Sequence, residues 1–269
     1  MKKYSIFLSI LSLSVMLSAN VKLPQIFADH AVLQRNAPIN VWGWADKGEK
    51  VVVTLNNQKQ SAVADSNGKW KLQLKAMPAG GPYRLTVKGK NTIILKDIML
   101  GEVWLCSGQS NMNYPLGGWE KGAEPIPTEE CSAIRQFKIN ETISAEPADD
   151  AVSGGWKTYS PEIGTQFSAV AYHFAKSLNA ELNIPIGIIN SSWGGTSIEA
   201  WISHSALIKL PDYTQVPGLT NQQLSSWLTN VEDLHSFYQK KFGVESLASY
   251  KTDDSQWRLP DYDDREWLA

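Results

Sequence analysis

The sequence predicts an α/β protein in which a small N-terminal β-sandwich precedes a hydrolase domain built on a parallel sheet. Two changes of pattern support this prediction. Between residues 22 and 96, short runs alternate apolar with polar side chains and are separated by turn residues. From residue 97 onward, longer apolar runs alternate with a segment of helical periodicity, which is the order found in parallel α/β sheets.

The N-terminal part is predicted to be antiparallel because its alternation has a period of two. Residues 69–75 and 83–88 each place apolar side chains on one face and polar side chains on the other, as half-buried strands do. Asn67-Gly68 and Gly80-Gly81 fall between such runs and favour turns. Turns at this spacing are typical of a small sandwich. This part contains no cluster of candidate catalytic groups, so we expect it to provide structural support.

The second part contains the elements of a parallel sheet. Residues 98–106 are almost continuously apolar, which predicts a strand buried on both faces, and residues 134–139 are a further candidate strand. The apolar positions of residues 167–182 fall on one helical face, and residues 184–189 lead into a strand that ends at Asn190. Loops at the carboxyl ends of parallel strands build the ligand sites of such folds. We therefore expect the site where these strands end.

The strand over residues 98–106 leads into a polar turn that presents Ser110. A rigid strand and a tight turn hold a serine hydroxyl in place, and the N-terminus of a following helix offers backbone N–H groups to a developing oxyanion. An ordinary strand-to-helix turn is the plain alternative. The string Gly-Gln-Ser-Asn-Met at residues 108–112 is longer and more specific than a bare G-x-S. We therefore predict that Ser110 is a catalytic nucleophile.

A second candidate loop follows the strand that ends at Asn190. Gly194-Gly195 allows the backbone to come close to a ligand, and Thr196 can cap the helix that follows. A glycine pair alone would indicate only a turn. Its position after an apolar strand, with the Ser110 turn upstream, favours an oxyanion loop.

Composition and charge argue against several kinds of partner. The chain has 25 Lys and Arg against 27 Asp and Glu, a net charge of −2, and no basic cluster among its aromatic residues, so no nucleic-acid partner is expected. Cys106 and Cys131 have no Cys or His neighbours at metal-ligand spacing, so no metal site is expected. Whether they form a disulfide stays open. The 11 tryptophans either pack the cores or stack on sugar rings.

The first residues have the pattern of an export signal. Lys2 and Lys3 precede an apolar stretch from residue 6 to 17, and Ser18-Ala19 supply small residues for cleavage. This stretch is too short and wrongly flanked for a membrane-spanning helix. We expect residues 1–19 to be removed and the protein to be exported, to the periplasm or the outside, with no membrane span afterwards. The sequence does not indicate the oligomeric state.

Three segments resemble the sialate O-acetylesterase family of SGNH-type carbohydrate esterases. They are residues 23–35 (LPQIFADHAVLQR), 108–112 (GQSNM) and 185–201 (PIGIINSSWGGTSIEAW). The resemblance implies that O-acetyl groups are removed from a sugar substrate, with sialic acids as the named sugars. It implies neither a metal nor an organic cofactor.

The resemblance also assigns roles to individual residues. It makes Ser110 the nucleophile and the backbone N–H groups of Ser110 and of Gly194 or Gly195 the oxyanion donors. Gln109 and Asn111 are implied to contact the substrate. Which of the two glycines donates stays open.

Some residues that the resemblance implies are not in this sequence. The family carries a Gln-Gly-Glu block and an Asp-x-x-His pair whose histidine is the general base, and neither occurs in these 269 residues. None of the four histidines, His30, His173, His204 and His235, lies in Asp-x-x-His. His204 follows the Gly194 loop most closely. We therefore expect no histidine of this chain within hydrogen-bond reach of the Ser110 hydroxyl.

These observations divide the chain into a signal peptide (1–19), a β-sandwich (22–96), the first part of an SGNH hydrolase domain (97–205) and a helical or irregular segment (206–250). Residues 251–269 resemble the opening of a jelly roll that many family members insert within the catalytic domain. We therefore expect the chain to be the front portion of a longer enzyme, with a hydrolase domain that is incomplete at its C-terminus.

Two other functions remain compatible with the sequence. The first is a non-catalytic carbohydrate-binding module of an exported glycan-processing system, in which tryptophans bind the sugar. The second is an esterase for acetylated plant polysaccharide, which uses the same chemistry on a different substrate.

Overall fold

The computed structural model describes residues 20–118, 126–215, 218 and 220–226. By its contacts the chain divides into two compact units, the first taking in Met1–Thr142 and Ala148–Ser203 and the second Ile143–Pro147 and His204–Ala269. The predicted signal peptide (1–19) and the segment 251–269 lie outside the described residues. Within the described part of the chain, no helix is long and apolar enough to cross a membrane.

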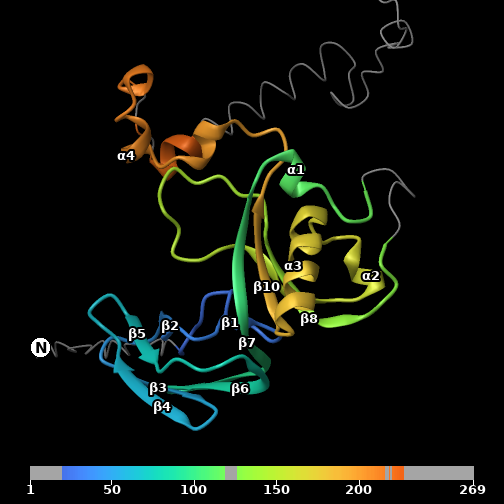
Figure 1. Cartoon of the computed structure of the whole chain (residues 1–269). Helices are drawn as coiled ribbons and strands as arrows, with labels where there is room; N and C mark the ends of the chain where they lie inside the picture. The colour runs from blue at the N-terminus through green and yellow to red at the C-terminus, as the bar shows by residue number, and fades with distance from the viewer. Residues whose placement is uncertain (1–19, 119–125, 216–217, 219, 227–269) are drawn as a thin grey trace, which may run out of the picture. The chain divides into compact units, whose positions relative to one another are not determined.

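The first unit is a mixed α/β structure built on one large sheet (Figure 1). Its strands lie in the order β4-β3-β6-β7-β10-β8-β9 with β1 beside β7, and β2 and β5 form a separate two-stranded ribbon. The strands are β1 (Val32–Gln34), β2 (Ile39–Trp44), β3 (Lys50–Leu55), β4 (Gln58–Val63), β5 (Lys69–Leu74), β6 (Gly80–Lys88), β7 (Thr92–Gly108), β8 (Cys131–Ile139), β9 (Ser153–Tyr159) and β10 (Ile186–Ser192).

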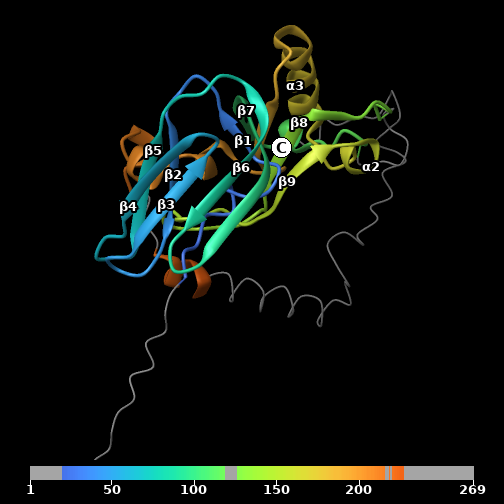
Figure 2. The same ribbon diagram turned by 90° about the horizontal axis from the view of Figure 1, so that it is seen from below.

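The N-terminal strands surround an apolar core. In β5, Trp70, Leu72 and Leu74 are buried while the residues between them are exposed, as their alternation predicts. Figure 2 shows β3, β4 and β6 side by side, with the β2–β5 ribbon next to them. The burial of one face of β2, β3, β5 and β6 against this core fixes the register of these strands.

β7 is a 17-residue strand that belongs to both parts of the large sheet. Its first residues pair antiparallel with β6, and between Leu95 and Ile98 it contains one residue more than β6 does. Asp97 lies in this bulge with a φ of +56°. Beyond it, β7 pairs parallel with β1 over residues 99–101 and with β10 over residues 102–108. The change of sequence pattern at residue 97 therefore coincides with a bulge inside one strand.

The large sheet is mixed, whereas the sequence predicts a parallel sheet after residue 97. β7, β10 and β8 run parallel to one another, but β9 pairs antiparallel with β8. The connection between these two strands, residues 140–152, contains no helix. A parallel return usually needs a crossover helix, so β9 returns as an antiparallel neighbour.

β7 also differs from the prediction of a strand buried on both faces. Leu105 is 67% exposed and Trp104 is 42% exposed. The helix α3 (Ala169–Leu182) lies along β10 and β8 in Figure 1. Its Phe174 packs edge-on against Trp104, with ring centroids 5.0 Å apart. The opposite face of β7 carries Leu105, which remains open.

α3 packs on the sheet through small side chains. Ser168 caps the helix by accepting a hydrogen bond from the Ala171 N–H at 3.2 Å, and Ala171 and Ala175 are fully buried. The predicted apolar face includes Val170, which is instead half exposed. The alanine side of the helix lies against the sheet because small residues allow the closest approach.

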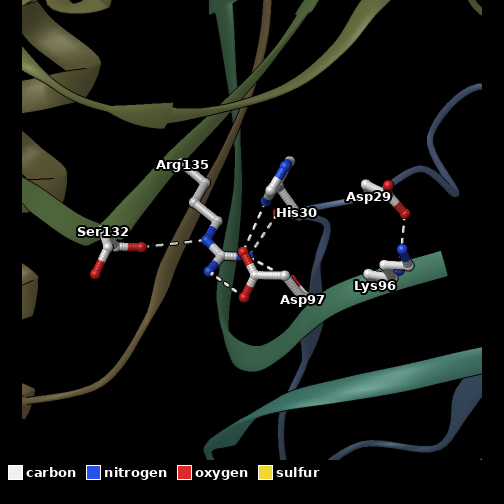
Figure 3. A network of polar contacts seen from close by, with 6 residues as sticks. All are labelled: Asp29, His30, Lys96, Asp97, Ser132 and Arg135. Atoms are coloured by element: carbon white, nitrogen blue, oxygen red, sulfur yellow. Dashed lines mark hydrogen bonds and ion pairs between the residues drawn. The ribbon is translucent and has the colours of Figure 1, made fainter.

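Arg135 of β8 joins the two parts of the first unit through a buried guanidinium group (Figure 3). Its Nη1 donates to the backbone oxygens of His30 at 2.9 Å and of Asp97 at 2.6 Å. Its Nη2 donates to the Asp97 carboxylate at 3.0 Å, and its Nε donates to the Ser132 backbone oxygen at 3.2 Å. The His30 ring lies 2.7 Å from the other carboxylate oxygen. The side chain of Arg135 is 3% exposed.

The second unit contains short helices in its described residues. They are α4 (His204–Leu207), the 3-10 helix η2 (Pro211–Tyr213) and a helical turn over residues 221–226. Within this unit, the side chain of Asn221 accepts hydrogen bonds from the Ala145 N–H and the Ser144 hydroxyl. These bonds connect residues 143–147 to the rest of the second unit.

Candidate functional site

Ser110 lies immediately beyond the end of β7, at the start of the short helix α1 (Ser110–Asn113). Gly108, the last residue of β7, has a φ of +151°, a conformation that side chains disfavour. The chain can therefore leave the strand and turn into the helix within two residues. Ser110 itself is partly buried, and Gln109 and Asn111 on either side of it are exposed.

The Gln109 side chain holds both polar hydrogens of Ser110. Its Oε1 accepts a hydrogen bond from the Ser110 N–H at 2.9 Å and another from the Ser110 hydroxyl at 3.0 Å. The N–H group that the sequence assigns to the oxyanion site is thus occupied by a side chain. Because Gln109 is exposed, a change of its rotamer can release both groups to a substrate.

The Gly194 loop lies against Ser110, as the sequence predicts. Ser192 at the end of β10 is paired with Gly108 at the end of β7, and the Trp193 N–H donates to the Gly108 backbone oxygen at 3.0 Å. A Cβ atom placed on Gly194 would lie 3.6 Å from the Ser110 Cα. The two loops are therefore neighbours because two parallel strands end in register.

The two glycines of this loop have different roles in the backbone. Gly195 has a φ of +77°, whereas Gly194 has a backbone conformation that residues with a side chain also adopt. Among the described residues, neither the Gly194 N–H nor the Gly195 N–H has a hydrogen-bond partner. Both are thus available as donors, and the choice between them stays open.

The rest of the loop is fixed by hydrogen bonds of its own. The Thr196 hydroxyl donates to the Trp193 backbone oxygen at 2.8 Å, and the Trp201 indole N–H donates to the Thr196 Oγ1 at 2.9 Å. A hollow of about 370 Å³ is lined by residues of both loops, including Gln109, which precedes Ser110 in the chain. Its walls come from both loops and from the 3-10 helix η1 (Ile198–Trp201). They are formed by Ser107, Gly108, Gln109, Thr196, Ile198 and Trp201.

A polar network beneath Ser110 was missed by the sequence prediction. The Asn113 Oδ1 accepts hydrogen bonds from the Lys138 ammonium at 2.5 Å and the Ser192 hydroxyl at 3.3 Å. Ser192 donates at 2.6 Å to Asn190, whose amide donates to Gln136 at 3.4 Å.

The three inner members of this network, Gln136, Asn190 and Ser192, are buried. The available signal was their polarity: they interrupt apolar runs, and buried polar side chains require partners. Their bonds cross from α1 to β10 and β8, so they hold the helix that begins with Ser110 on the sheet.

The histidines of the first unit do not contact Ser110. His30 pairs with Asp97, and the ring of His173 lies edge-on to Tyr172 on α3. Among the described residues of this unit, the Ser110 hydroxyl bonds only to Gln109. His204 begins α4 in the second unit, and His235 lies outside the described residues.

Neither cysteine acts in a disulfide or as an evident nucleophile. Cys106 and Cys131 are both free, which settles the question that the sequence left open. Burial raises the pKa of the Cys106 thiol, so its reactive thiolate form is disfavoured. In the described residues, no group of three or more His, Cys, Asp or Glu side chains could hold a metal ion.

Known proteins are similar to this chain over the region that contains the two loops. Residues 100–216, which include both loops, match the family described as carbohydrate esterase, sialic acid-specific acetylesterase. A carbohydrate acetylesterase from Xanthomonas citri has a similar structure, with a TM-score of 0.67 and 39% sequence identity. The similarity covers 73% of this chain and 45% of that protein.

Mammalian relatives are similar over much the same region. The sialate O-acetylesterase of Mus musculus is 33% identical over 186 residues, covering 62% of this chain and 34% of the relative. That of Homo sapiens is 34% identical over 196 residues, covering 65% and 38%. The chain thus spans little more than a third of the length of these relatives. With the two loops inside it, the matched region is similar to sialate O-acetylesterases, which are carboxylic ester hydrolases.

Proposed function

We propose that this chain carries the nucleophile and the oxyanion donors of an exported carbohydrate O-acetylesterase. The observation that carries the proposal is the contact between Ser110 and Gly194 at the joint end of β7 and β10. In support, Ser110 lies against the loop whose Gly194 and Gly195 N–H groups have no partner among the described residues, and residues of both loops line a hollow. This is the arrangement that acyl transfer through a serine requires.

The proposed reaction has two steps. The Ser110 Oγ attacks the acetyl carbonyl carbon as its proton passes to a general base, and the Gly194 or Gly195 N–H stabilises the oxyanion together with the Ser110 N–H. The C–O bond to the sugar then breaks, and the sugar oxygen takes the proton from the base. Water attacks the acetyl-serine in the second step, releasing acetate and restoring the hydroxyl.

The general base of this reaction is proposed to be a histidine of an Asp-x-x-His pair outside residues 1–269. The support for this is that the histidines described in the first unit have other contacts. A serine without its base loses about 10⁴-fold or more in rate. The 269-residue chain is therefore proposed to hold the nucleophile in a weakly active form.

The finer description of the fold is also a proposal. We assign residues 22–96 to a β-sandwich, 97–205 to the first part of an SGNH-type domain, 206–250 to a helical or irregular segment and 251–269 to the start of a jelly roll. The parallel β7, β10 and β8 strands, with α3 on one face, support the second assignment. Residues 1–19 are proposed to be a signal peptide that directs export to the periplasm or the outside.

The substrate is proposed to be a sugar bearing an O-acetyl group, either a sialic acid or an acetylated plant polysaccharide. A non-catalytic binding module is the rival function, in which Ser110 would be a relic. The position of the Gly194 loop against Ser110 favours the esterase, because a module that only binds sugar needs no serine next to a loop of backbone donors.

Acetate release from p-nitrophenyl acetate, O-acetylated sialic acid and acetyl-xylan tests the proposal. The 269-residue chain should release little acetate, and Ser110→Ala should barely change the rate. A longer protein that includes the Asp-x-x-His pair should hydrolyse the esters, and Ser110→Ala should lower its kcat/KM by about 10⁴-fold.

Two results would contradict parts of this proposal. Strong Ser110-dependent activity of the 269-residue chain would show that a base is already present. A longer protein that contains the pair yet leaves every ester intact would favour the binding module. The preference between sialic acid and xylan esters then assigns the substrate class.

A further inference from the structure

The outer face of the β2–β5 ribbon carries aromatic and charged side chains in a regular pattern. Trp42 and Trp44 are two residues apart on β2 and so lie on the same face. Across the ribbon, Trp42 is paired with Lys71 and Trp44 with Lys69. Side chains of residues paired in this way are within about 5.5 Å at their Cβ atoms. Each of these tryptophans therefore has a lysine as its cross-strand neighbour.

These side chains line a hollow of about 500 Å³ that is separate from the Ser110 site. Trp42 is 37% exposed, and Phe27 packs edge-on against its ring with centroids 4.8 Å apart. That contact fixes the orientation of the ring while leaving part of its surface open. The remaining walls come from Asn40, Asp65, Trp70 and Asp149, with the two tryptophans and two lysines.

The two lysines of the hollow differ in their charge partners. The Lys69 ammonium is paired with both carboxylate oxygens of Asp149, at 2.8 and 2.9 Å. Lys71 is exposed, and among the described residues it has no ion-pair partner. The Asp65 carboxylate accepts hydrogen bonds from the Asn67 and Lys69 N–H groups. The two lysines and two aspartates of the hollow therefore balance in formal charge, and Lys71 is the lysine that is left to pair with a ligand.

A second hollow of about 390 Å³ adjoins the first. Trp42 and Asp149 line both hollows. The second is lined mostly by apolar residues and reaches Ile189 of β10, three residues before Ser192.

We infer that the hollow over the β2–β5 ribbon binds a carboxylate-bearing sugar residue of a glycan. The apolar face of the sugar ring packs on the Trp42 indole, and its carboxylate pairs with the Lys71 ammonium. Amphipathic indole rings suit this contact because they combine an apolar face with little conformational freedom. The carboxylate comes from either a sialic acid or a uronic acid. This binding does not require the reaction proposed for Ser110.

Calorimetric titration of the 269-residue protein tests the inference. The probes are sialyllactose and a glucuronic-acid-bearing xylotetraose, with lactose and xylotetraose as their neutral counterparts. At least one acidic sugar should bind roughly fivefold more tightly than its neutral counterpart, and the difference should shrink at high salt. The acidic sugar that binds more tightly identifies the source of the carboxylate.

Variants separate this hollow from other binding surfaces. Lys71→Gln should remove the preference for the acidic sugar, Lys71→Arg should keep it, and Lys59→Gln, an exposed lysine of β4, serves as the matched control. Trp42→Ala should weaken binding roughly tenfold or more, with its thermal unfolding compared to that of the parent protein. Because Trp42 packs on Phe27, the two Lys71 variants keep the test valid even where Trp42→Ala fails to fold.

Ser110→Ala distinguishes the inference from the proposed esterase function. Binding should be unchanged in this variant. Loss of binding in Ser110→Ala would place the sugar at the Ser110 site and overturn the inference. It is also overturned where no acidic sugar binds, where acidic and neutral sugars bind equally, or where Lys71→Gln leaves the preference intact.

Discussion

The two ends of the β7–β10–β8 region each carry a polar cluster, and the clusters differ in how far their members are satisfied. At the bulge of β7, Asp97 pairs with a histidine and an arginine. At the carboxyl end of the same strand, Ser110 lies beside a loop with two unpartnered N–H groups. An acid–histidine pair would ordinarily draw attention to the first cluster as the reactive one.

The contacts point the other way. Arg135 is almost fully buried, and its donors go to the Asp97 carboxylate and to backbone oxygens of His30, Asp97 and Ser132. Two of these residues, His30 and Asp97, have positive φ angles of +68° and +56°. The charges of Asp97 and Arg135 are thus paired, and the two turns with positive φ angles are hydrogen-bonded. Such a cluster stabilises the contact between chain segments.

The Ser110 end has the opposite character. In the part of the chain that the structure describes, its hydroxyl and N–H bond only to the exposed side chain of Gln109. The network from Asn113 to the buried Gln136 holds the helix on the sheet. Rigid support below and replaceable bonds above are what a reactive group needs. The comparison teaches that incomplete pairing, rather than the residue types alone, marks the site.

The largest expected effect is a loss of folding stability when Arg135 is replaced, and it tests the difference between the two clusters. Arg135→Met should lower the free energy of unfolding by about 3 kcal/mol, because three backbone oxygens and a carboxylate lose their donor. Urea denaturation followed by circular dichroism measures the change. Ser110→Ala and Lys157→Met, a change at an exposed lysine of β9, should each stay within about 0.5 kcal/mol. A stability loss at Ser110 equal to that at Arg135 would remove the distinction between the two ends.

A smaller loss of folding stability is expected when the glycine pair beside Ser110 is replaced. Gly195→Ala should cost about 1 kcal/mol, since its φ of +77° is unfavourable for a residue with a Cβ. Gly194→Ala is the matched control, because its Cβ would meet Ser110 only at an ordinary contact distance of 3.6 Å. Thermal unfolding of the two variants compares them directly. Equal losses at both positions would show that crowding, not backbone conformation, requires glycine here.

The smallest expected effect is the pH dependence that Asp97 gives to the folding stability. Burial alone would raise the pKa of this carboxyl, but hydrogen bonds from His30 and Arg135 outweigh it and hold its pKa below the usual value. A lowered pKa in the folded state stabilises the protein above the unfolded value of about 3.9, and the contribution is lost as the pH falls below it.

Denaturation of His30→Gln and of His30→Gln with Asp97→Asn isolates this carboxyl from the imidazole. Their difference in unfolding free energy should be constant between about pH 7 and 5 and should shrink below about pH 4. Because Asp97 is a third exposed, we expect the change to be under about 1 kcal/mol. A difference that grows on acidification would show that Asp97 is not held ionised in the folded state.

The sequence by itself determined the α/β class, the resemblance to carbohydrate esterases and the two loops that the structure brings together. Strand alternation and long apolar runs report which faces are buried, and the strings around Ser110 and Gly194 are local, so each is readable from neighbouring residues. The strand ends they follow are adjacent in the sheet, and the predicted proximity is present.

Only the tertiary structure decided which polar residues are paired and which are free. The bond from Asn190 to Gln136 joins residues 54 positions apart, and that from Arg135 to His30 joins residues 105 apart. No local pattern encodes such pairs, because they depend on strand order and register. The exposure of the Leu105 side chain and the antiparallel pairing of β9 with β8 likewise depend on the tertiary structure. Burial and pairing are properties of neighbours in space, and the sequence lists neighbours along the chain.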